Sequence, residues 1–256
     1  MVSYKIYPVK YCEQYVPGPE MFYMSGWESW LNIYFYFWII DDGNKNILVD
    51  TGIRDVNEIN PLVESIFGER GKFRMSMERE GIPILLRERG VNPKNVKYVI
   101  LTHLHYDHAS NVKLFPNAQI VVSKKGLLNT ISCPFLEMVP HPLFPRDVIS
   151  YLVNEARDRL ILAEDEEITD GISVFWIGGH TMCSQAVKVK TKSGSAVLTG
   201  DTVFLYENIE KNVPVGLNVS LMECYTAMKK IRNEADIIIP SHDPKVLERY
   251  PTGVIE

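Results

Sequence analysis

A heptapeptide that begins at Thr102, THLHYDH, constrains this chain of 256 residues more than any other segment. It contains four potential metal ligands: His103, His105, Asp107 and His108. The apolar run at 99–101 (VIL) comes directly before it and predicts a strand. Imidazoles and carboxylates at a strand end are poor core material and good ligands for divalent metals. A chance HxHxDH is expected in about one such chain in several thousand, so the motif indicates a metal site.

Three more potential ligands follow apolar strands in the same way. They are His180, Asp201 and His242, and each lies beside small or turn residues. Because several strands of one sheet can end at a common cleft, we expect these side chains to meet the heptapeptide. The alternative is that they are hydrogen-bonded polar residues of ordinary loops. The remaining histidine, His141, lies in a proline-rich segment and is interpreted as a loop residue.

Composition limits the class of protein. The chain is 46% hydrophobic and 23% charged, which suits a soluble globular protein with a substantial core. We find no linker, low-complexity stretch or short repeat, so residues 1–256 are expected to form a single domain. The net charge of −5 argues against nucleic acid or an anionic membrane surface as the main partner.

The sequence also predicts a cytoplasmic location. No run of eighteen apolar residues exists, so no membrane span is expected, and the N-terminus lacks the pattern of a secretion signal. The four cysteines are widely spread and form no CxxC pair. Reduced thiols in a cytoplasmic protein are the simplest interpretation.

Periodicity predicts a mixture of strands and helices. Strands are expected at 2–9, 33–40, 46–50, 97–101, 118–123, 159–163, 172–177, 185–189, 196–199 and 236–240. Helices are expected in pieces over 55–90, as one or two turns at 109–115, and at 148–157 and 220–231. Asp41-Asp42-Gly43-Asn44 is predicted to be a hairpin turn. This mixture indicates α/β or α+β layers.

Two irregular segments are candidates for pocket walls. Residues 12–31 are rich in large apolar side chains, and the segment at 133–145 contains four prolines. The first is either a lid over an apolar substrate or a loop packed on the core or in a dimer interface.

The set of motifs resembles the metallo-β-lactamase superfamily, whose members carry HxHxDH, a later histidine after glycine, a strand-end aspartate and a final histidine. The resemblance extends from Asp50 to His242. It implies an α+β fold, a four-layer αβ/βα sandwich, with two metals in a cleft at the edge of the β-sandwich.

The resemblance also implies a role for each ligand. The first metal would be held by His103, His105 and His180, and the second by Asp107, His108 and His242, with Asp201 bridging both. Asp50 would orient a ligand histidine from outside. The implied cofactor is two divalent metal ions, Zn²⁺ in the first place, with Fe or Mn as alternatives.

Hydrolysis is the chemistry that such a site implies. Two zinc ions about 3.5–4 Å apart can lower the pKa of a shared water and polarise a carbonyl oxygen. Attack by the bridging hydroxide would open the acyl bond, and Asp107 would pass a proton to the leaving group. A glutamate in place of His105 would suit a di-iron redox site instead, but the histidine is present.

Within the superfamily, the chain is most similar to the N-acyl-homoserine-lactone lactonases. The likeness includes the segments 48–52, 101–108 and 201–214. The expected substrate is therefore a small molecule with a lactone or ester carbonyl, and a homodimer is the expected assembly. The alternatives are a thioesterase of the glyoxalase II type or a cyclic amide hydrolase. A helical substrate domain usual in the former is not expected in the fourteen residues after His242. A metal-binding protein without turnover has less support, because every expected ligand is present.

The sequence departs from the lactonase pattern at two places. Met182-Cys183-Ser184 replaces the usual PGH after GHT. Phe204 stands where the lactonases commonly carry a tyrosine whose hydroxyl is aimed at the substrate carbonyl, and phenylalanine has no donor. Tyr206 is the candidate to replace that hydroxyl, since strand alternation would place it on the face of Phe204. These departures leave another lactone, an ester or a cyclic amide open as the substrate.

Overall fold

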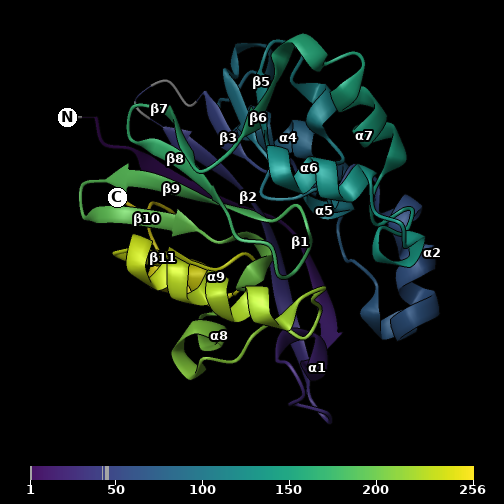
Figure 1. The fold of residues 1–256 in the computed structure, drawn as a ribbon. Coiled ribbons are helices and arrows are strands. Elements are labelled where there is room, and N and C mark those ends of the chain that lie inside the picture. The colour runs from purple at the N-terminus through teal and green to yellow at the C-terminus, as the bar shows by residue number, and fades with distance from the viewer. Residues whose placement is uncertain (1, 42, 44–45) are drawn as a thin grey trace.

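The strands form two sheets that face one another (Figure 1). The structure is a computed structural model and describes residues 2–41, 43 and 46–256. The first sheet contains, in spatial order, β1 (Lys5–Pro17), β2 (Trp30–Asp41), β3 (Ile47–Val49), β4 (Tyr98–Ile100), β5 (Gln119–Ser123) and β6 (Leu160–Ala163). The second contains β11 (Ile237–Ile239), β10 (Gly194–Leu198), β9 (Gln185–Thr191), β8 (Ile172–Trp176) and β7 (Glu166–Thr169).

Helices connect the strands and cover the outer faces of the sheets. The α-helices are α1 (Gly18–Met21), α2 (Val56–Phe67), α3 (Met77–Glu80), α4 (Ile82–Glu88), α5 (Tyr106–Ala109), α6 (Lys124–Ile131), α7 (Arg146–Val153), α8 (Tyr206–Lys211), α9 (Leu221–Glu234) and α10 (Lys245–Arg249). Short 3₁₀ turns are η1 (Glu69–Gly71), η2 (Pro93–Asn95), η3 (Val112–Leu114), η4 (Leu136–Met138), η5 (Arg157–Arg159) and η6 (Gly200–Thr202). No helix in the described part of the chain is both long enough and apolar enough to cross a membrane.

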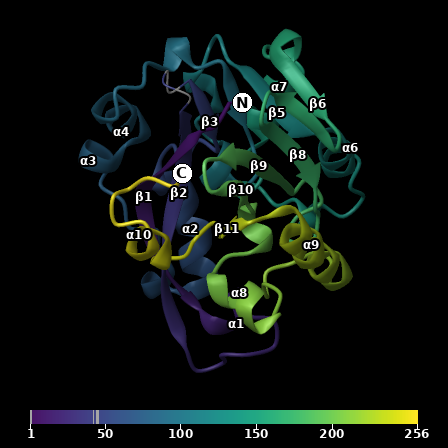
Figure 2. The same cartoon turned by 90° about the vertical axis from the view of Figure 1, so that its left-hand side faces the viewer.

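Three hydrophobic clusters define four layers. One cluster lies between the sheets and joins, for example, Val121 of β5 to Leu198 of β10. A second buries α2, α4 and α7 against the first sheet. The third buries Met228 and Ile231 of α9 against the second sheet, and Figures 1 and 2 show α9 along the outer side of that sheet. The predicted α+β four-layer sandwich is confirmed.

In each sheet, parallel strands bring the segments that carry the potential ligands to the same end of the sheet. In the first sheet β3, β4 and β5 are parallel, with Val49, Ile100 and Val121 in register. In the second sheet β10 and β11 are parallel, with Leu198 opposite Ile239. Because parallel strands end at the same edge, the residues that follow them emerge side by side. This register decides where the polar residues after each strand meet.

The N-terminal strand is longer than predicted. β1 continues to Pro17 and pairs with β2 along its whole length, so the prediction that residues 12–17 are irregular is wrong. The register shifts between Lys10 and Cys12, and this bulge interrupts the alternation of apolar residues on which a strand prediction depends.

Other local predictions had mixed outcomes. The predicted helix at 220–231 is α9, with Ser220 as its N-cap, and the strand at 236–240 is β11. The elements β7, α6, α8 and α10 were not predicted, and β7, α8 and α10 have too few residues to show a period. The predicted turn at 41–44 includes Asp42 and Asn44, which lie outside the described residues.

Helix α9 provides a stability test. The Ser220 hydroxyl accepts a hydrogen bond from the Glu223 backbone N–H at 3.3 Å. We expect Ser220→Ala to lower the free energy of unfolding by about 1 kcal/mol, because the helix end loses this cap. Urea denaturation measures the change. Ser65→Ala, on the exposed side of α2, is the matched control and should change stability by less than about 0.5 kcal/mol. Equal effects of the two substitutions would contradict the capping role.

Candidate metal centre

The heptapeptide leaves β4 and turns at once into the single-turn helix α5. His105 is the N-cap, and its carbonyl accepts the Ala109 N–H at 2.9 Å. The turn is fixed from outside, because the Tyr11 hydroxyl donates to the Asp107 carbonyl at 2.7 Å. All four potential ligands of this segment are buried. A strand end followed by one tight turn therefore concentrates them in one place.

The other three potential ligands enter from the second sheet. His180 lies in the loop after β8, Asp201 in η6 after β10, and His242 just after β11. The loop before His180 depends on Gly179, which has a φ of 81° and whose added Cβ would meet Cys224 of α9 at 2.8 Å. Only glycine fits both the backbone conformation and this close approach to the helix.

The seven side chains form two groups that share Asp201. The groups are His103, His105, His180 and Asp201, and Asp107, His108, Asp201 and His242. Within each group the ligand atoms lie within 4.8 Å of one another. The structure thus brings together every residue that the resemblance proposed as a ligand, in the same two sets. His141 lies apart from them on an exposed loop.

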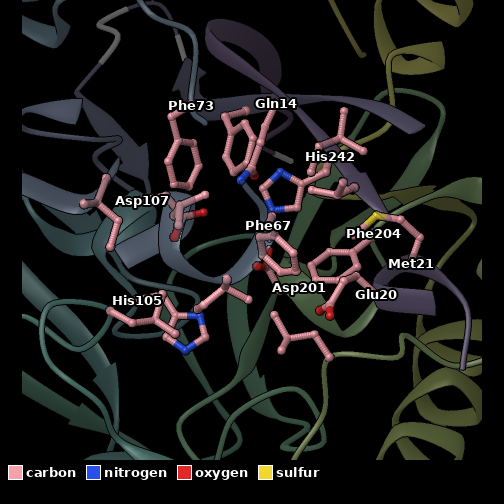
Figure 3. Close-up of a pocket in the computed structure, with 18 of the residues that line it drawn as sticks. Gln14, Glu20, Met21, Phe67, Phe73, His105, Asp107, Asp201, Phe204 and His242 are labelled. Atoms are coloured by element: carbon pink, nitrogen blue, oxygen red, sulfur yellow. Dashed lines mark ion pairs between the residues drawn. The ribbon is translucent and has the colours of Figure 1, made fainter. Parts of the chain in front are cut away.

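The two oxygens of Asp201 face different groups. Oδ2 lies 3.6 Å from His103 Nε2 and 3.5 Å from His180 Nε2. Oδ1 lies 3.2 Å from His108 Nε2 and 3.0 Å from His242 Nε2. Figure 3 shows Asp201 between His105 and His242 at the base of a pocket. This is the geometry that a carboxylate shared by two cations requires.

Unpartnered polar atoms indicate that cations fit the two groups. His103 Nε2, His108 Nε2 and Asp201 Oδ1 are buried and make no hydrogen bond with any described residue. Leaving a buried polar atom unpaired costs about 1–3 kcal/mol, so such atoms are rare. Here the three atoms without a hydrogen bond all belong to the two groups, and each is an atom type that coordinates divalent metals.

The electrostatics keep the first group ready to bind metal. Burial lowers the pKa of His105 to about 3, and the neighbouring His180 acts in the same direction. Burial likewise lowers the pKa of His103 and of His180. These imidazoles are therefore neutral near pH 7, with lone pairs available for a metal, which is the form that coordinates.

In the second group, charges on neighbouring side chains outweigh burial in setting the pKa values. Burial acts to lower the pKa of His108, but Asp107, Asp201 and Asp50 outweigh it and hold the pKa well above its usual value. Burial acts to raise the pKa of Asp201, yet the surrounding imidazoles, His108 first, hold it well below its usual range. A negative charge is thus stabilised at the shared position.

Outer hydrogen bonds fix the orientation of the imidazoles. His108 Nδ1 lies 2.8 Å from Asp50 Oδ2, and the Thr102 backbone N–H donates to Asp50 Oδ1 at 2.8 Å. His180 Nδ1 donates to the Leu217 carbonyl at 2.7 Å, and His242 Nδ1 donates to the Tyr34 carbonyl at 3.0 Å. Each contact leaves Nε2 directed at Asp201. The expected position of Asp50 behind a ligand histidine is present.

A pocket of about 230 Å³ opens beside both groups. Its apolar wall comprises Val16, Met21, Ile33, Phe35, Ile59, Leu62, Val63, Ile66, Phe67, Phe73, Leu143, Phe204 and Leu217. Part of the segment at 12–31 lines it, as expected, but Trp27 does not and is 67% exposed. From the loop at 133–145, Leu143 contributes to the wall.

Helix α2 supplies a wall that the sequence interpretation missed. Ile59, Leu62, Val63 and Ile66 recur at the spacing of one helix face and line the pocket. The signal was present as this apolar stripe, but a stripe of that kind more often packs on a core, so it did not indicate a pocket.

Phe204 and Tyr206 separate in space. The ring of Phe204 lies in the pocket, 5.4 Å from the His180 ring and 5.3 Å from the His242 ring. The chain then turns into α8, so Tyr206 does not continue a strand and instead packs in the cluster between the sheets. The prediction that Tyr206 replaces the missing tyrosine hydroxyl is wrong, because its ring lies outside the pocket beneath Arg249.

Comparison with known proteins identifies the class. The model of the metallo-beta-lactamase superfamily matches residues 36–242. The chain belongs to this superfamily.

Several curated relatives are named as lactonases. An N-acyl homoserine lactonase of Bacillus cereus is 24% identical over 218 residues, which cover 83% of this chain and 82% of the relative. The N-acyl homoserine lactonase AiiA of Bacillus thuringiensis subsp. kurstaki is 27% identical over the same coverage.

Solved structures share the fold over almost the whole chain. A variant of B. thuringiensis AiiA with N-decanoyl-L-homoserine bound at its active site superposes with a TM-score of 0.78 at 24% identity, covering 97% of both chains. AidC, a dizinc quorum-quenching lactonase in complex with a product, gives a TM-score of 0.69 at 16% identity, covering 95% of this chain and 89% of AidC.

The Asp50 contact predicts a change in metal affinity. Asp50→Asn keeps the size of the side chain but removes the charge that faces His108 Nδ1, so the imidazole is held less firmly and is a weaker ligand. We expect metal affinity to fall by about 10–100-fold. Competition with a chromophoric chelator measures it. Asp147→Asn, at an exposed carboxylate paired with Arg54, is the control and should leave the affinity unchanged. Equal affinities of wild type and Asp50→Asn would refute the orienting role.

The position of Tyr206 predicts that removing its hydroxyl stabilises the folded protein. Its buried hydroxyl makes no hydrogen bond with a described residue. Tyr206→Phe should therefore raise the free energy of unfolding by about 1 kcal/mol. The control is Tyr36→Phe in the same cluster, which removes a bond to the Asp243 carbonyl and should destabilise by a similar amount. Thermal unfolding compares the two variants, and a Tyr206→Phe protein less stable than wild type would contradict this account.

Proposed function

We propose that the protein is a dinuclear metal-dependent hydrolase that opens a lactone. The observation that carries this proposal is Asp201, whose two oxygens each face a separate set of imidazoles beside an apolar pocket. Two curated relatives are named as N-acyl homoserine lactonases, which supports a lactone as the substrate.

The residues divide between two metal positions. We propose that His103, His105 and His180 hold one metal and that Asp107, His108 and His242 hold the other, with Asp201 shared. Two bound cations would supply an activated water and a Lewis acid for the carbonyl oxygen. Zinc suits this donor set of imidazole nitrogen and carboxylate oxygen.

Asp107 is the residue that we assign to proton transfer. Its carboxylate lines the pocket, and Oδ2 lies 3.0 Å from His108 Nε2. Burial acts to raise the pKa of Asp107, but His108 outweighs this and keeps it lowered, so the group is ionised near pH 7. From that position it would take the proton of the attacking water and pass it to the alkoxide that leaves as the ring opens.

The pocket favours a small, largely apolar substrate. Phe204 fills the place beside His180 and His242 where a hydroxyl donor would otherwise reach the carbonyl. Among the described residues that line the pocket there is no lysine or arginine. A glutathione thioester carries two carboxylates that such a wall cannot pair, so the geometry favours a lactone over that thioester.

A cytoplasmic location is also proposed. It is supported by the cysteines, since Cys12, Cys133, Cys183 and Cys224 are all unpaired. A homodimer stays a prediction.

Hydrolysis of a panel of substrates tests the function. Lactones, simple esters, thioesters and cyclic amides are assayed with the purified protein, whose metal content is measured by elemental analysis. We expect close to two metals per chain and lactone opening that is lost on chelation. Protein without metal, or turnover that survives chelation, would refute the proposal.

Two substitutions test the assigned roles. Asp107→Asn and His180→Ala should each lower kcat/KM by at least about 100-fold while the protein stays folded, because each removes a residue of the reacting site. Circular dichroism checks the fold. The control is Asp147→Asn, and full activity in either site variant would contradict its role.

A further inference from the structure

The pocket wall contains a carboxylate that the proposed hydrolysis does not use. Glu20 lines the cavity and is half-buried, and Figure 3 shows it beside Phe204 on the side where Met21 lies. Its carboxylate makes no hydrogen bond or ion pair with any residue that the structure describes. Burial alone raises the pKa of Glu20, with no charged neighbour contributing. An acidic group is therefore held, without a partner, against an apolar cavity.

The backbone at Glu20 is fixed to the loop behind the metal centre. The Glu20 carbonyl accepts the N–H groups of Gly216 at 2.9 Å and Leu217 at 3.2 Å. Leu217 in turn accepts the bond from His180 Nδ1. An added Cβ at Gly216 would lie 1.6 Å from the Pro19 carbonyl oxygen, so the two segments approach as closely as glycine permits. Glu20 thus has a defined position relative to the candidate ligands.

The second polar group of the wall also offers an acceptor. Gln14 donates through Nε2 to the Gly71 carbonyl at 2.6 Å, which leaves its amide oxygen without a hydrogen bond among the described residues. The remaining polar groups that line the pocket belong to the candidate metal ligands. Away from the candidate metal ligands, the Glu20 carboxylate and the Gln14 amide oxygen are therefore free acceptors, and the wall lacks the hydroxyl donor that Phe204 would have carried as a tyrosine.

A pocket wall with unpaired acceptors favours ligands that carry a hydrogen-bond donor. A half-buried carboxylate without a partner is costly, and a ligand N–H that reaches it recovers a charge-assisted hydrogen bond. A ligand of the same shape without that N–H leaves the carboxylate desolvated and unpaired. The apolar neighbours Met21, Phe204 and Leu217 offer no side-chain donor in place of the ligand N–H.

We propose that Glu20 is a specificity-determining residue that accepts a hydrogen bond from an N–H group of the substrate. This inference rests on the proposed lactone hydrolysis and narrows its substrate class to lactones that carry an N–H next to an apolar body. An ammonium group and an amide N–H can both donate this hydrogen bond. The full negative charge of the Glu20 carboxylate favours the ammonium group, whereas its oxygens can accept a hydrogen bond from either.

Binding of ring-opened products tests the inference without turnover. Three hydroxy acids with the same apolar body are compared by calorimetry on the metal-loaded protein. One carries an acylamino group, one an ammonium group, and one a methylene in place of the nitrogen. We expect wild type to bind at least one N–H compound about 10-fold more tightly than the methylene compound. In Glu20→Leu the ratio should fall to about 1.

Further variants make the result specific. Glu20→Met is a second apolar substitution of similar length in case Glu20→Leu does not fold. Glu20→Gln keeps an acceptor but removes the charge, so loss of the preference identifies an ammonium and retention identifies an amide. Glu28→Leu, at an exposed carboxylate in the loop that follows α1, is the matched control and should keep the wild-type ratio.

The outcomes separate the two proposals. Equal affinities of the three compounds for wild type, or a preference that survives in the apolar variants, would overturn the role of Glu20. Failure of the wild-type protein to open any lactone, with the Glu20-dependent preference intact, would contradict the proposed hydrolysis and leave the recognition of the N–H established.

Discussion

The carboxylate of Asp201 is the group on which the arrangement of the whole site depends. It is 4% exposed and lies within 3.0–3.6 Å of four imidazole nitrogens. Removing a carboxylate from water costs several kcal/mol unless close positive or polar partners offset the loss. Those partners come from the ends of β4, β8 and β11, so both sheets must end at the same place for the charge to be tolerated. The facing sheets and their register are therefore a requirement of this one buried group.

The same constraint explains which parts of the site could be predicted from the sequence. A ligand that directly follows an apolar strand is fixed by the strand, and parallel neighbours such as β10 and β11 bring Asp201 and His242 together without any knowledge of the loops. His103 and His105 are only two residues apart in the sequence, so their proximity needs little tertiary information. The four-layer fold was implied by the resemblance of these motifs to the metallo-β-lactamase superfamily, whereas periodicity alone indicated only α/β or α+β layers.

The pocket wall could not be predicted, because its residues are joined by packing alone. Ile59 and Ile66 lie on a helix face that would look the same if it covered a core. For Tyr206 the sequence did indicate a place in the pocket, and that prediction was wrong. Alternation placed it with Phe204, but one helical turn after Leu205 sends the hydroxyl between the sheets, and nothing local in the sequence signals that turn. The bulge in β1 likewise depends on its pairing with β2. Such features follow from contacts between distant segments, which periodicity does not record.

The contrast between the base of the pocket and its wall bears on how this enzyme would select a substrate. At the base, the orientation of the candidate ligands is constrained, because His108, His180 and His242 each have a second nitrogen hydrogen-bonded to a carboxylate or a backbone carbonyl. With Phe204 in the wall, polarisation of the carbonyl would rest on bound cations, because none of the described residues that line the pocket carries a side-chain hydroxyl. Differences in rate between substrates then arise from how the rest of the molecule fits the wall. An apolar surface discriminates weakly, by about 1–3 kcal/mol per methylene, whereas an unpaired buried acceptor discriminates strongly. On the role proposed for Glu20, the few polar atoms of Gln14 and Glu20 would influence substrate choice more than the larger apolar area around them.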